Sequence, residues 1–148
     1  MDLELRAYRI VDKDRLVEIL QQNVPAYFDE SEVADFIHYL DQEIEQYFVA
    51  ELDGVIVGSG GINFDEGGRI GVISWDVIQP EFQGKGIGSS LLKFRLDILK
   101  SIKSVEKIIV RTSQLTFAFY EKNGFVLLEI KKDYWAQGFD LYKMIYAG

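Results

Sequence analysis

The strongest signal in this sequence is the stretch Gln83-Gly84-Lys85-Gly86-Ile87-Gly88-Ser89-Ser90, which separates an apolar run at 70–78 from an apolar-periodic segment at 86–101. Its alternating glycines permit a tight turn and a close approach of a ligand to the backbone. The first amides of a helix lack partners within the helix, and the helix dipole adds partial positive charge there. The stretch therefore predicts an anion site suited to phosphate, and Lys85 adds a cation beside it.

Two other glycine-rich motifs can be tested against the same letters. A P-loop needs four residues between its first glycine and a Gly-Lys-Ser/Thr end, and this spacing does not occur here. The Rossmann fingerprint G-x-G-x-x-G also fails, because Ser89 stands where its third glycine belongs. The remaining alternative is a strand-to-helix turn whose glycines serve packing alone.

The stretch resembles the acyl-CoA-binding signature of the GCN5-related N-acetyltransferase family, Gln/Arg-x-x-Gly-x-Gly/Ala, and a second family block stands downstream at 119–125. The resemblance implies that acetyl-CoA is the cosubstrate, with its pyrophosphate on the amides of 83–89. It also implies that the main chain of Val77 and Ile78 pairs with the pantetheine arm, and that Ser113 contributes a hydroxyl. The predicted cofactor-binding residues are Val77, Ile78, Gln83, Gly84, Lys85, Gly86, Ile87, Gly88, Ser89, Ser113 and Tyr120.

Length and composition predict one domain over residues 1–148. Hydrophobic residues make up 48% of the chain and aromatic residues 14%, which argues against disorder. There is no apolar run long enough for a transmembrane helix, and the N-terminus does not read as a signal peptide. The absence of cysteine excludes disulfides, thiolate metal sites and cysteine nucleophiles, and it fits a cytoplasmic protein. With His38 as the single histidine, no metal site is expected, and His38 itself is expected at the surface.

The formal net charge of -8 makes nucleic acid an unfavourable partner. A membrane partner is not expected either. An acidic surface instead favours a cationic acceptor, such as an amine. A polyanionic cosubstrate must then bind through local groups, namely oriented amides and the nearby Lys85.

Periodicity and turn residues predict the element order β-α-α-β-β-β-α-β-α-β-β. A helix follows Asp12, and a second begins at Asp29 with Glu32 as its capping partner. Strands are expected at 3–10, 47–52, 55–64, 69–78, 107–110, 125–130 and 139–146, helices also at 86–101 and 116–122, and a loop at 131–138. By resemblance, this is the N-acetyltransferase fold, an α/β (α+β) fold. Its mixed, mostly antiparallel sheet has about six to seven strands, with helices on both faces. The strand before the glycine-rich turn should splay from the next strand.

Acyl transfer from a thioester to an amine needs a deprotonated amine, a polarised carbonyl and a stabilised leaving thiolate. The resemblance assigns the last task to Tyr120, whose phenol, with a reference pKa of ~10, stays protonated at neutral pH. A structural aromatic is the alternative. Asp76 is the best candidate for the general base, because burial in an apolar strand makes a carboxylate a stronger base. Glu66, Glu51, an ordered water or a purely structural Asp76 remain open.

Contacts to the acceptor are expected from the first two helices and from the loop before the last strand, with Tyr27, Phe28, Tyr134 and Trp135 as candidates. By resemblance, Tyr134 stands where relatives that acetylate protein N-termini often carry a tyrosine. The sequence thus predicts an acetyl-CoA-dependent N-acetyltransferase acting directly on a primary amine of a small amine, an amino acid or a peptide. A non-catalytic CoA-binding sensor or interaction module is the alternative. The resemblance also implies a homodimer, with the final strands at its interface.

Overall fold

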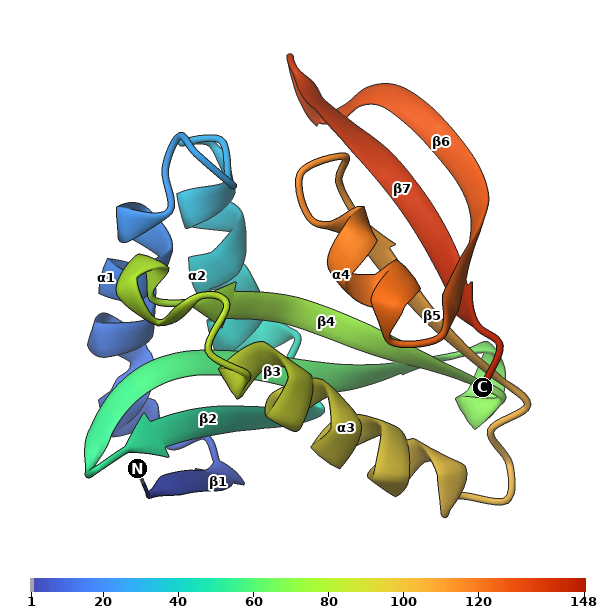
Figure 1. Ribbon diagram of the computed structural model, residues 1–148, viewed down its shortest axis with the longest axis horizontal. Helices are drawn as coiled ribbons and strands as arrows, with labels where there is room; N and C mark the ends of the chain where they lie inside the picture. Colours follow the sequence, from blue (N-terminus) through green and yellow to red (C-terminus); the bar gives the residue numbers. More distant parts are fainter. Residues whose placement is uncertain (1) are drawn as a thin grey trace.

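The computed structural model describes residues 2–148, and Met1, the first residue of the predicted domain, lies outside the described residues (Figure 1). Within 2–148, seven strands form one sheet in the order β1-β2-β3-β4-β5-β7-β6. The strands are β1 (Leu3–Ala7), β2 (Gln46–Leu52), β3 (Val55–Asp65), β4 (Ile70–Ile78), β5 (Lys107–Thr112), β6 (Phe125–Ala136) and β7 (Phe139–Tyr146). The helices are α1 (Lys13–Gln22), α2 (Glu32–Gln42), α3 (Ile87–Lys100) and α4 (Phe117–Lys122), with short 3-10 turns η1 (Ile10–Asp12), η2 (Glu66–Gly68) and η3 (Pro80–Phe82).

The sheet is mixed and mostly antiparallel, as predicted. β1 to β4 form an antiparallel meander, and β4 pairs in parallel with β5. β7 then lies antiparallel between β5 and β6. In Figure 1, β6 and β7 curve away from the plane of β2, β3 and β4.

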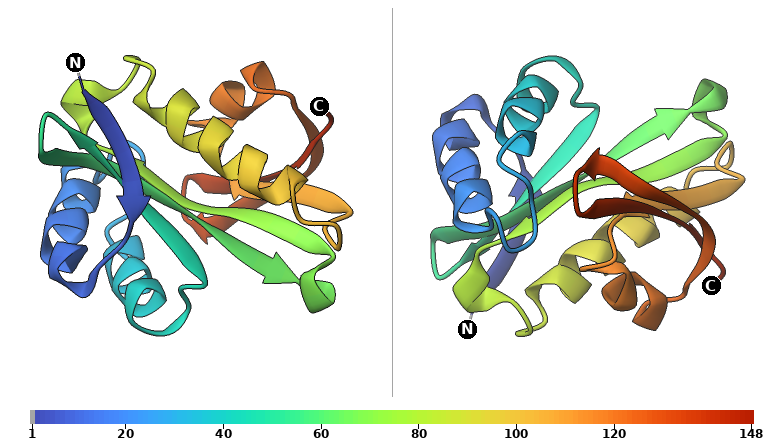
Figure 2. Two further views of the ribbon diagram at one scale, coloured as in Figure 1. Left: turned by 90° about the horizontal axis from the view of Figure 1, so that it is seen from below. Right: turned by 90° about the horizontal axis from the view of Figure 1, so that it is seen from above.

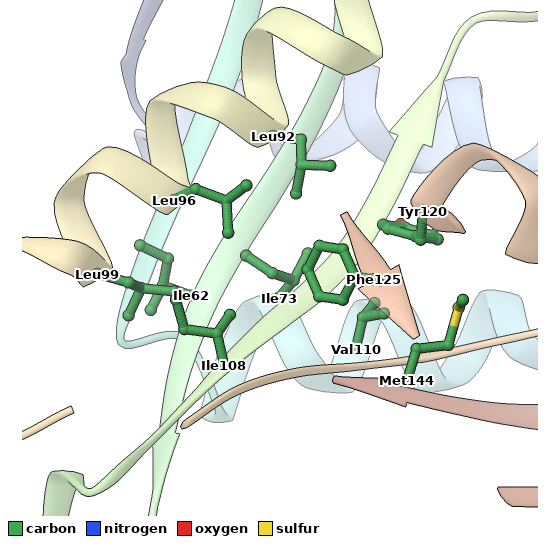
Figure 3. Packing of buried hydrophobic residues seen from close by; sticks show 10 residues of the cluster. All are labelled: Ile62, Ile73, Leu92, Leu96, Leu99, Ile108, Val110, Tyr120, Phe125 and Met144. Carbon is green, nitrogen blue, oxygen red and sulfur yellow. The ribbon is translucent and has the colours of Figure 1, made fainter. Parts of the chain in front are cut away.

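Helices cover both faces of the sheet, which confirms the predicted arrangement. Figure 2 shows α1 and α2 on one side and α3 and α4 on the other. On the first side, Leu16, Ile19 and Phe36 pack on Val49 and Val77. On the second side, leucines of α3 pack on residues of β3, β4 and β5, and Tyr120 of α4 joins the same cluster (Figure 3). Burying one such leucine contributes about 1.5–3 kcal/mol.

The glycines inside β3 have a steric explanation. A Cβ at Gly61 would collide with Tyr47, and one at Gly60 would lie 2.8 Å from Cζ of Arg95. The β3–β4 register also shifts between Ser59 and Gly61, which marks a β-bulge. β4 therefore has one residue more than β3 at this point, and two of its residues lie opposite Gly60. One of them, Trp75, has a positive φ of 48°.

Several predicted boundaries differ from the structure. The first strand ends at Ala7 rather than at position 10, because the Asp12 carboxylate accepts hydrogen bonds from Arg6 and from the Arg9 amide and turns the chain into η1. Asp12 makes no side-chain cap to α1. The helical span of α2 begins at Glu32 rather than at Asp29, but the predicted capping contact is present, because the Glu32 carboxylate accepts from the Asp29 amide.

The predicted loop at 131–138 is wrong, because β6 continues to Ala136 and pairs there with Phe139. Asp133 holds this extension in place. Its amide donates to Asp140, and its carboxylate accepts from the Gly138 amide across the hairpin. The register of β6 shifts after Lys131, so this part of the strand does not show a simple alternation of apolar and polar residues.

The predicted splay between β4 and β5 is present. β5 pairs with β4 along 70–73, whereas 74–78 of β4 continue past this register and pair with β3 on their other side. The second half of β4 therefore presents a free edge toward the helix that follows it. Among residues 2–148, none of the helices is long and apolar enough to cross a membrane.

Candidate active site

A cleft of about 770 Å³ opens where β4 leaves β5. Its walls come from the free edge of β4, the start of α3, the segment before and within α4, the region between α1 and α2, and the β6–β7 hairpin. This volume lies in the ordinary range for small-molecule sites, roughly 300–1,000 Å³.

The start of α3 forms one half of the cleft. The helical bonding of α3 begins with the Ser90 amide on the Gly86 carbonyl at 3.0 Å, which leaves the amides just before it outside the ladder. Gly84 and Gly86 have φ of 75° and 85°, and a Cβ at either would meet no atom of residues 2–148 within 4 Å. Open space, glycine backbone and free amides fit the pyrophosphate of acetyl-CoA.

The free edge of β4 forms the floor of the same half. The Gln79 amide donates to Val57 of β3, so by strand alternation Val77 also faces β3, whereas Ile78 faces the free edge. Ile78 lines the cleft, while the Val77 side chain is buried against α1 and α2. The structure thus differs from the expectation that both main chains face the cleft.

A buried amide pair anchors the turn before α3. The Gln83 side chain donates to Oδ1 of Asn23 at 2.9 Å, and the Asn23 amide donates to the carbonyls of Ile19 and Ile78. Gln83 therefore fixes the turn to the end of α1 and to the end of β4. Its side-chain nitrogen is therefore engaged within the protein, whereas its backbone lies in the turn before α3.

Asp76 stands at the bulge of β4 and joins two other elements. Its carboxylate lies 2.5 Å from Nη2 of Arg95 on α3, close enough for an ion pair although outside hydrogen-bond alignment. The Tyr120 hydroxyl of α4 donates to the other oxygen of Asp76. Arg95 is fully buried, and it also donates to the carbonyls of Leu91 and Gly61. Asp76, Arg95 and Tyr120 thus form one network, here called the Asp76 network.

Tyr120 remains a phenol in this setting. Burial raises the pKa of the Tyr120 hydroxyl well above its ordinary value. The Asp76 charge and hydrogen bond raise it further, and Arg95 opposes this. Tyr120 lines the cleft beside Asp76. Its hydroxyl is therefore a proton donor held at a defined position.

The other half of the cleft is aromatic. Tyr27, Phe28, Trp75 and Trp135 line it, and the Phe28 and Trp75 rings stack with centroids 6.2 Å apart. The Trp135 indole donates to the Thr112 carbonyl, which fixes the β6–β7 hairpin against the end of β5.

The structure brings most predicted site residues to the cleft. Those that line it are Tyr27, Phe28, Asp76, Ile78, Gln83, Gly84, Gly86, Gly88, Ser89, Ser113, Tyr120 and Trp135. Four predicted residues are placed elsewhere. Val77 and Ile87 are buried in the core, the Lys85 ammonium lies over the Phe82 ring, and Tyr134 is half exposed beside Trp135.

Sequence reasoning missed three residues of this region. Asn23 and Glu32 line the cleft, and Arg95 lies behind Asp76. A signal for Arg95 existed, because a cation stands between Leu91 and Leu99 on the apolar face of α3. No comparable pattern marks Asn23 or Glu32. Within 2–148, no group of three or more His, Cys, Asp or Glu residues is placed to hold a metal ion.

Comparison with known proteins identifies the family of this chain. The profile of the Acetyltransferase (GNAT) family matches residues 13–125. An N-alpha-acetyltransferase of Sulfurisphaera tokodaii is 28% identical over 161 residues, with 97% of this chain and 92% of that protein covered. An N-alpha-acetyltransferase of Saccharolobus solfataricus is 29% identical over 160 residues, with the same coverage of both.

Solved structures share the fold. An acetyltransferase of the GNAT family from Desulfovibrio desulfuricans superposes with a TM-score of 0.83 at 16% identity, covering 99% of both chains. The PaiA N-acetyltransferase of Thermoplasma acidophilum, solved in complex with coenzyme A, gives 0.75 at 18% identity and covers both chains fully. At such identities the likeness concerns the fold.

A splayed sheet, a helix start with free amides and a phenol in one cleft fit the class of acyltransferases that use acyl-CoA. With the family profile covering most of the sequence, this chain belongs to the Acetyltransferase (GNAT) family. It is an acetyl-CoA-dependent N-acetyltransferase that acts on amine acceptors. The alternative of a non-catalytic CoA-binding module has no support from the relatives.

Proposed function

We propose that this chain transfers the acetyl group of acetyl-CoA directly to the free α-amine of a peptide or protein, as one domain over residues 1–148 and without a metal ion. The relatives that align over 97% of the chain are N-alpha-acetyltransferases. The aromatic half of the cleft, with Tyr27, Phe28 and Trp135, offers apolar walls for a peptide N-terminus. Small amines and amino acids are the competing acceptors.

The donor side of the reaction rests on the backbone. Amides at the start of α3 would hold the pyrophosphate, and the free edge of β4 at Ile78 would run beside the pantetheine arm. Lys85 lies over Phe82 at 5.7 Å from the ring centroid and would add long-range attraction rather than a fixed contact. The acetyl thioester supplies the activated acyl group when bound.

The chemistry at the thioester would use Tyr120 as the acid. As the amine attacks the carbonyl, the C–N bond forms and the C–S bond breaks, and the phenol donates its proton to the sulfur. Both oxygens of Asp76 are already engaged, one by Arg95 and one by Tyr120. This geometry favours a positioning role for Asp76 over its predicted role as general base.

One observation carries the proposal. The start of α3, with its free amides, and the Tyr120 side chain line the same cleft as the aromatic residues. An assay of thiol release from acetyl-CoA tests it on four acceptors: a short peptide with a free N-terminus, its N-formylated copy, a free amino acid and spermidine. Turnover of the free peptide and loss of turnover with the blocked copy are expected. Preference for spermidine would contradict the peptide assignment, and CoA binding without any turnover would contradict catalysis.

We also propose that the chain is cytoplasmic and forms a homodimer through β6. β6 is the last strand of the sheet, and it carries exposed apolar side chains at Val126, Leu127, Leu128 and Ile130, which are 37–56% exposed. An exposed apolar edge strand invites pairing with a second copy. Light scattering after size exclusion should give twice the chain mass. The variant Leu128→Lys should give the monomer mass, and a wild-type monomer would contradict this proposal.

A further inference from the structure

Glu32 differs from the other inward-facing carboxylates of this chain. Asp12 and Asp76 each lie beside a guanidinium, Arg6 at 2.8 Å and Arg95 at 2.5 Å. Glu32 is only 7% exposed, yet it takes part in none of the salt bridges of residues 2–148. A buried carboxylate without a cation is unfavourable, so an external cation would bind there with a gain.

The one hydrogen bond of the Glu32 side chain leaves half of the carboxylate free. Oε2 accepts from the Asp29 amide at 2.9 Å, and among residues 2–148 no donor satisfies Oε1. Glu32 is one of the residues that line the cleft. Burial raises the pKa of the Glu32 carboxyl. The charges of Asp29 and Asp35 also raise it, and the Asp29 amide opposes this.

The surroundings of Glu32 suit an ammonium ion. The same cleft is lined by Tyr27, Phe28 and Trp75, and aromatic rings attract cations. The charged neighbours that face Glu32, Asp29 and Asp35, are both acidic. A protonated primary amine would therefore find a carboxylate, two further negative charges and aromatic walls.

We propose that the Glu32 carboxylate binds the ammonium group of the acceptor and accepts its first proton, an inference that rests on the proposed function. The neutral amine then attacks the thioester carbonyl. As the C–N bond forms, the amine nitrogen loses a second proton. In the overall reaction this loss balances the proton that Tyr120 gives to the sulfur. Glu32 returns its own proton to solvent, so one proton is released in each turnover.

The variant Glu32→Gln tests this role, because its amide oxygen can still accept from the Asp29 amide while the charge is lost. We expect at least a tenfold rise in the acceptor KM, an unchanged KM for acetyl-CoA, and loss of the acidic limb of the kcat/KM profile. The melting temperature should stay equal or rise, because the variant removes an unpaired buried charge. Glu30→Gln is the matched control, since Glu30 is exposed and two residues away, and it should behave as wild type.

Each outcome separates this inference from the proposed function. Equal acceptor KM values and pH profiles for wild type and Glu32→Gln would overturn the role of Glu32 while leaving the transferase proposal intact. A lower melting temperature with unchanged acceptor KM would show a structural carboxylate. No turnover by wild type on any acceptor of the panel would overturn the proposed function instead. Glu32→Asp, which keeps the charge, should recover part of the acceptor affinity.

Discussion

At the residue scale, the reacting part of the cleft depends on a side chain buried behind it. Arg95 forms an ion pair with Asp76, and the Asp76 carboxylate accepts a hydrogen bond from the Tyr120 hydroxyl. A Cβ at Gly60 would collide with Asp76 and with Arg95, so β3 leaves room for this pair. The network therefore fixes the direction of the Tyr120 hydroxyl through contacts from three elements.

Removing the phenol should affect the chemical step. In Tyr120→Phe the ring still packs against Phe119 and Phe125, whereas the proton donor is lost. We expect kcat to fall about 10²–10⁴-fold, the usual contribution of a positioned acid, with little change in the KM for acetyl-CoA. Steady-state kinetics checks this, and wild-type kcat in the variant would remove Tyr120 from the mechanism.

Breaking the buried ion pair should cost stability more than replacing it. Asp76→Asn leaves Arg95 buried without an anion, which costs roughly 3–5 kcal/mol, and the double variant Asp76→Asn with Arg95→Met should regain much of this. Urea unfolding measures both. The exposed pair Lys93–Asp97 on the same helix is the control, and its neutralisation should change stability by under about 1 kcal/mol. In the double variant kcat should stay low, because the Tyr120 hydroxyl no longer donates to the charged carboxylate of Asp76.

The family resemblance points to Tyr120, and the apolar strand around Asp76 makes this carboxylate stand out as a candidate. They did not show that the two side chains bind each other. That contact depends on the bulge at Trp75, which no alternation pattern reveals. Arg95 was overlooked because a helix that carries many leucines was interpreted only through its apolar face.

At the element scale, α3 combines two tasks. Its inner face carries Leu92, Leu96 and Leu99 into the core, and its first turn faces the cleft with free amides. The core contacts fix the direction of the helix, so the amides point at the same place in every molecule. A site made of backbone also explains why two glycines, Gly84 and Gly86, precede the helix.

An added methyl group at the start of α3 should weaken the donor site. Gly86 has φ of 85°, so Gly86→Ala strains the backbone by roughly 1–2 kcal/mol and places a Cβ in the open space of the cleft. We expect a higher KM for acetyl-CoA and a slightly lower melting temperature, with the order of acceptor preference unchanged. Ser90→Ala, an exposed position on the same turn, is the control. An unchanged KM in Gly86→Ala would argue against phosphate binding at this turn.

Elements with a strong period were predicted well, whereas those set by side-chain contacts were not. The apolar periodicity of α2 and α3 and the alternation in the meander led to the right order and type of elements. The predicted ends of β1 and β6 are wrong, because Asp12 and Asp133 shape the backbone there through side-chain hydrogen bonds to residues six and seven positions away. Patterns of apolar and polar residues do not report such specific side-chain contacts.

At the scale of the whole molecule, the net negative charge of the chain acts in opposite ways on its two ligands. The chain has a net charge of -8, yet its cosubstrate is a polyanion. The start of α3 must therefore attract phosphate locally, against the mean field. A cationic acceptor is helped by the same field over longer distances.

Salt should therefore act on the acceptor more than on the donor. For a peptide with a lysine after its free N-terminus, kcat/KM should fall as ionic strength rises from about 0.01 to 0.15 M, over which the screening length shortens from about 30 to 8 Å. A peptide with neutral side chains should show a smaller decrease. Initial rates at several salt concentrations measure both slopes. Equal slopes would mean that the acidic surface plays no part in attracting the acceptor.

The splay between β4 and β5 assigns the two ligands to different segments of the chain. The donor half is built mainly from 76–90 and is held by Asn23, whereas the aromatic half draws on Tyr27, Phe28, Trp75 and the β6–β7 hairpin. Acceptor preference could consequently drift, or be redesigned by exchanging 27–32 with the matching segment of a homologue, while Asn23 and thioester recognition are kept. One scaffold can in this way give rise to a lineage of enzymes that share an acyl donor and differ in their acceptors.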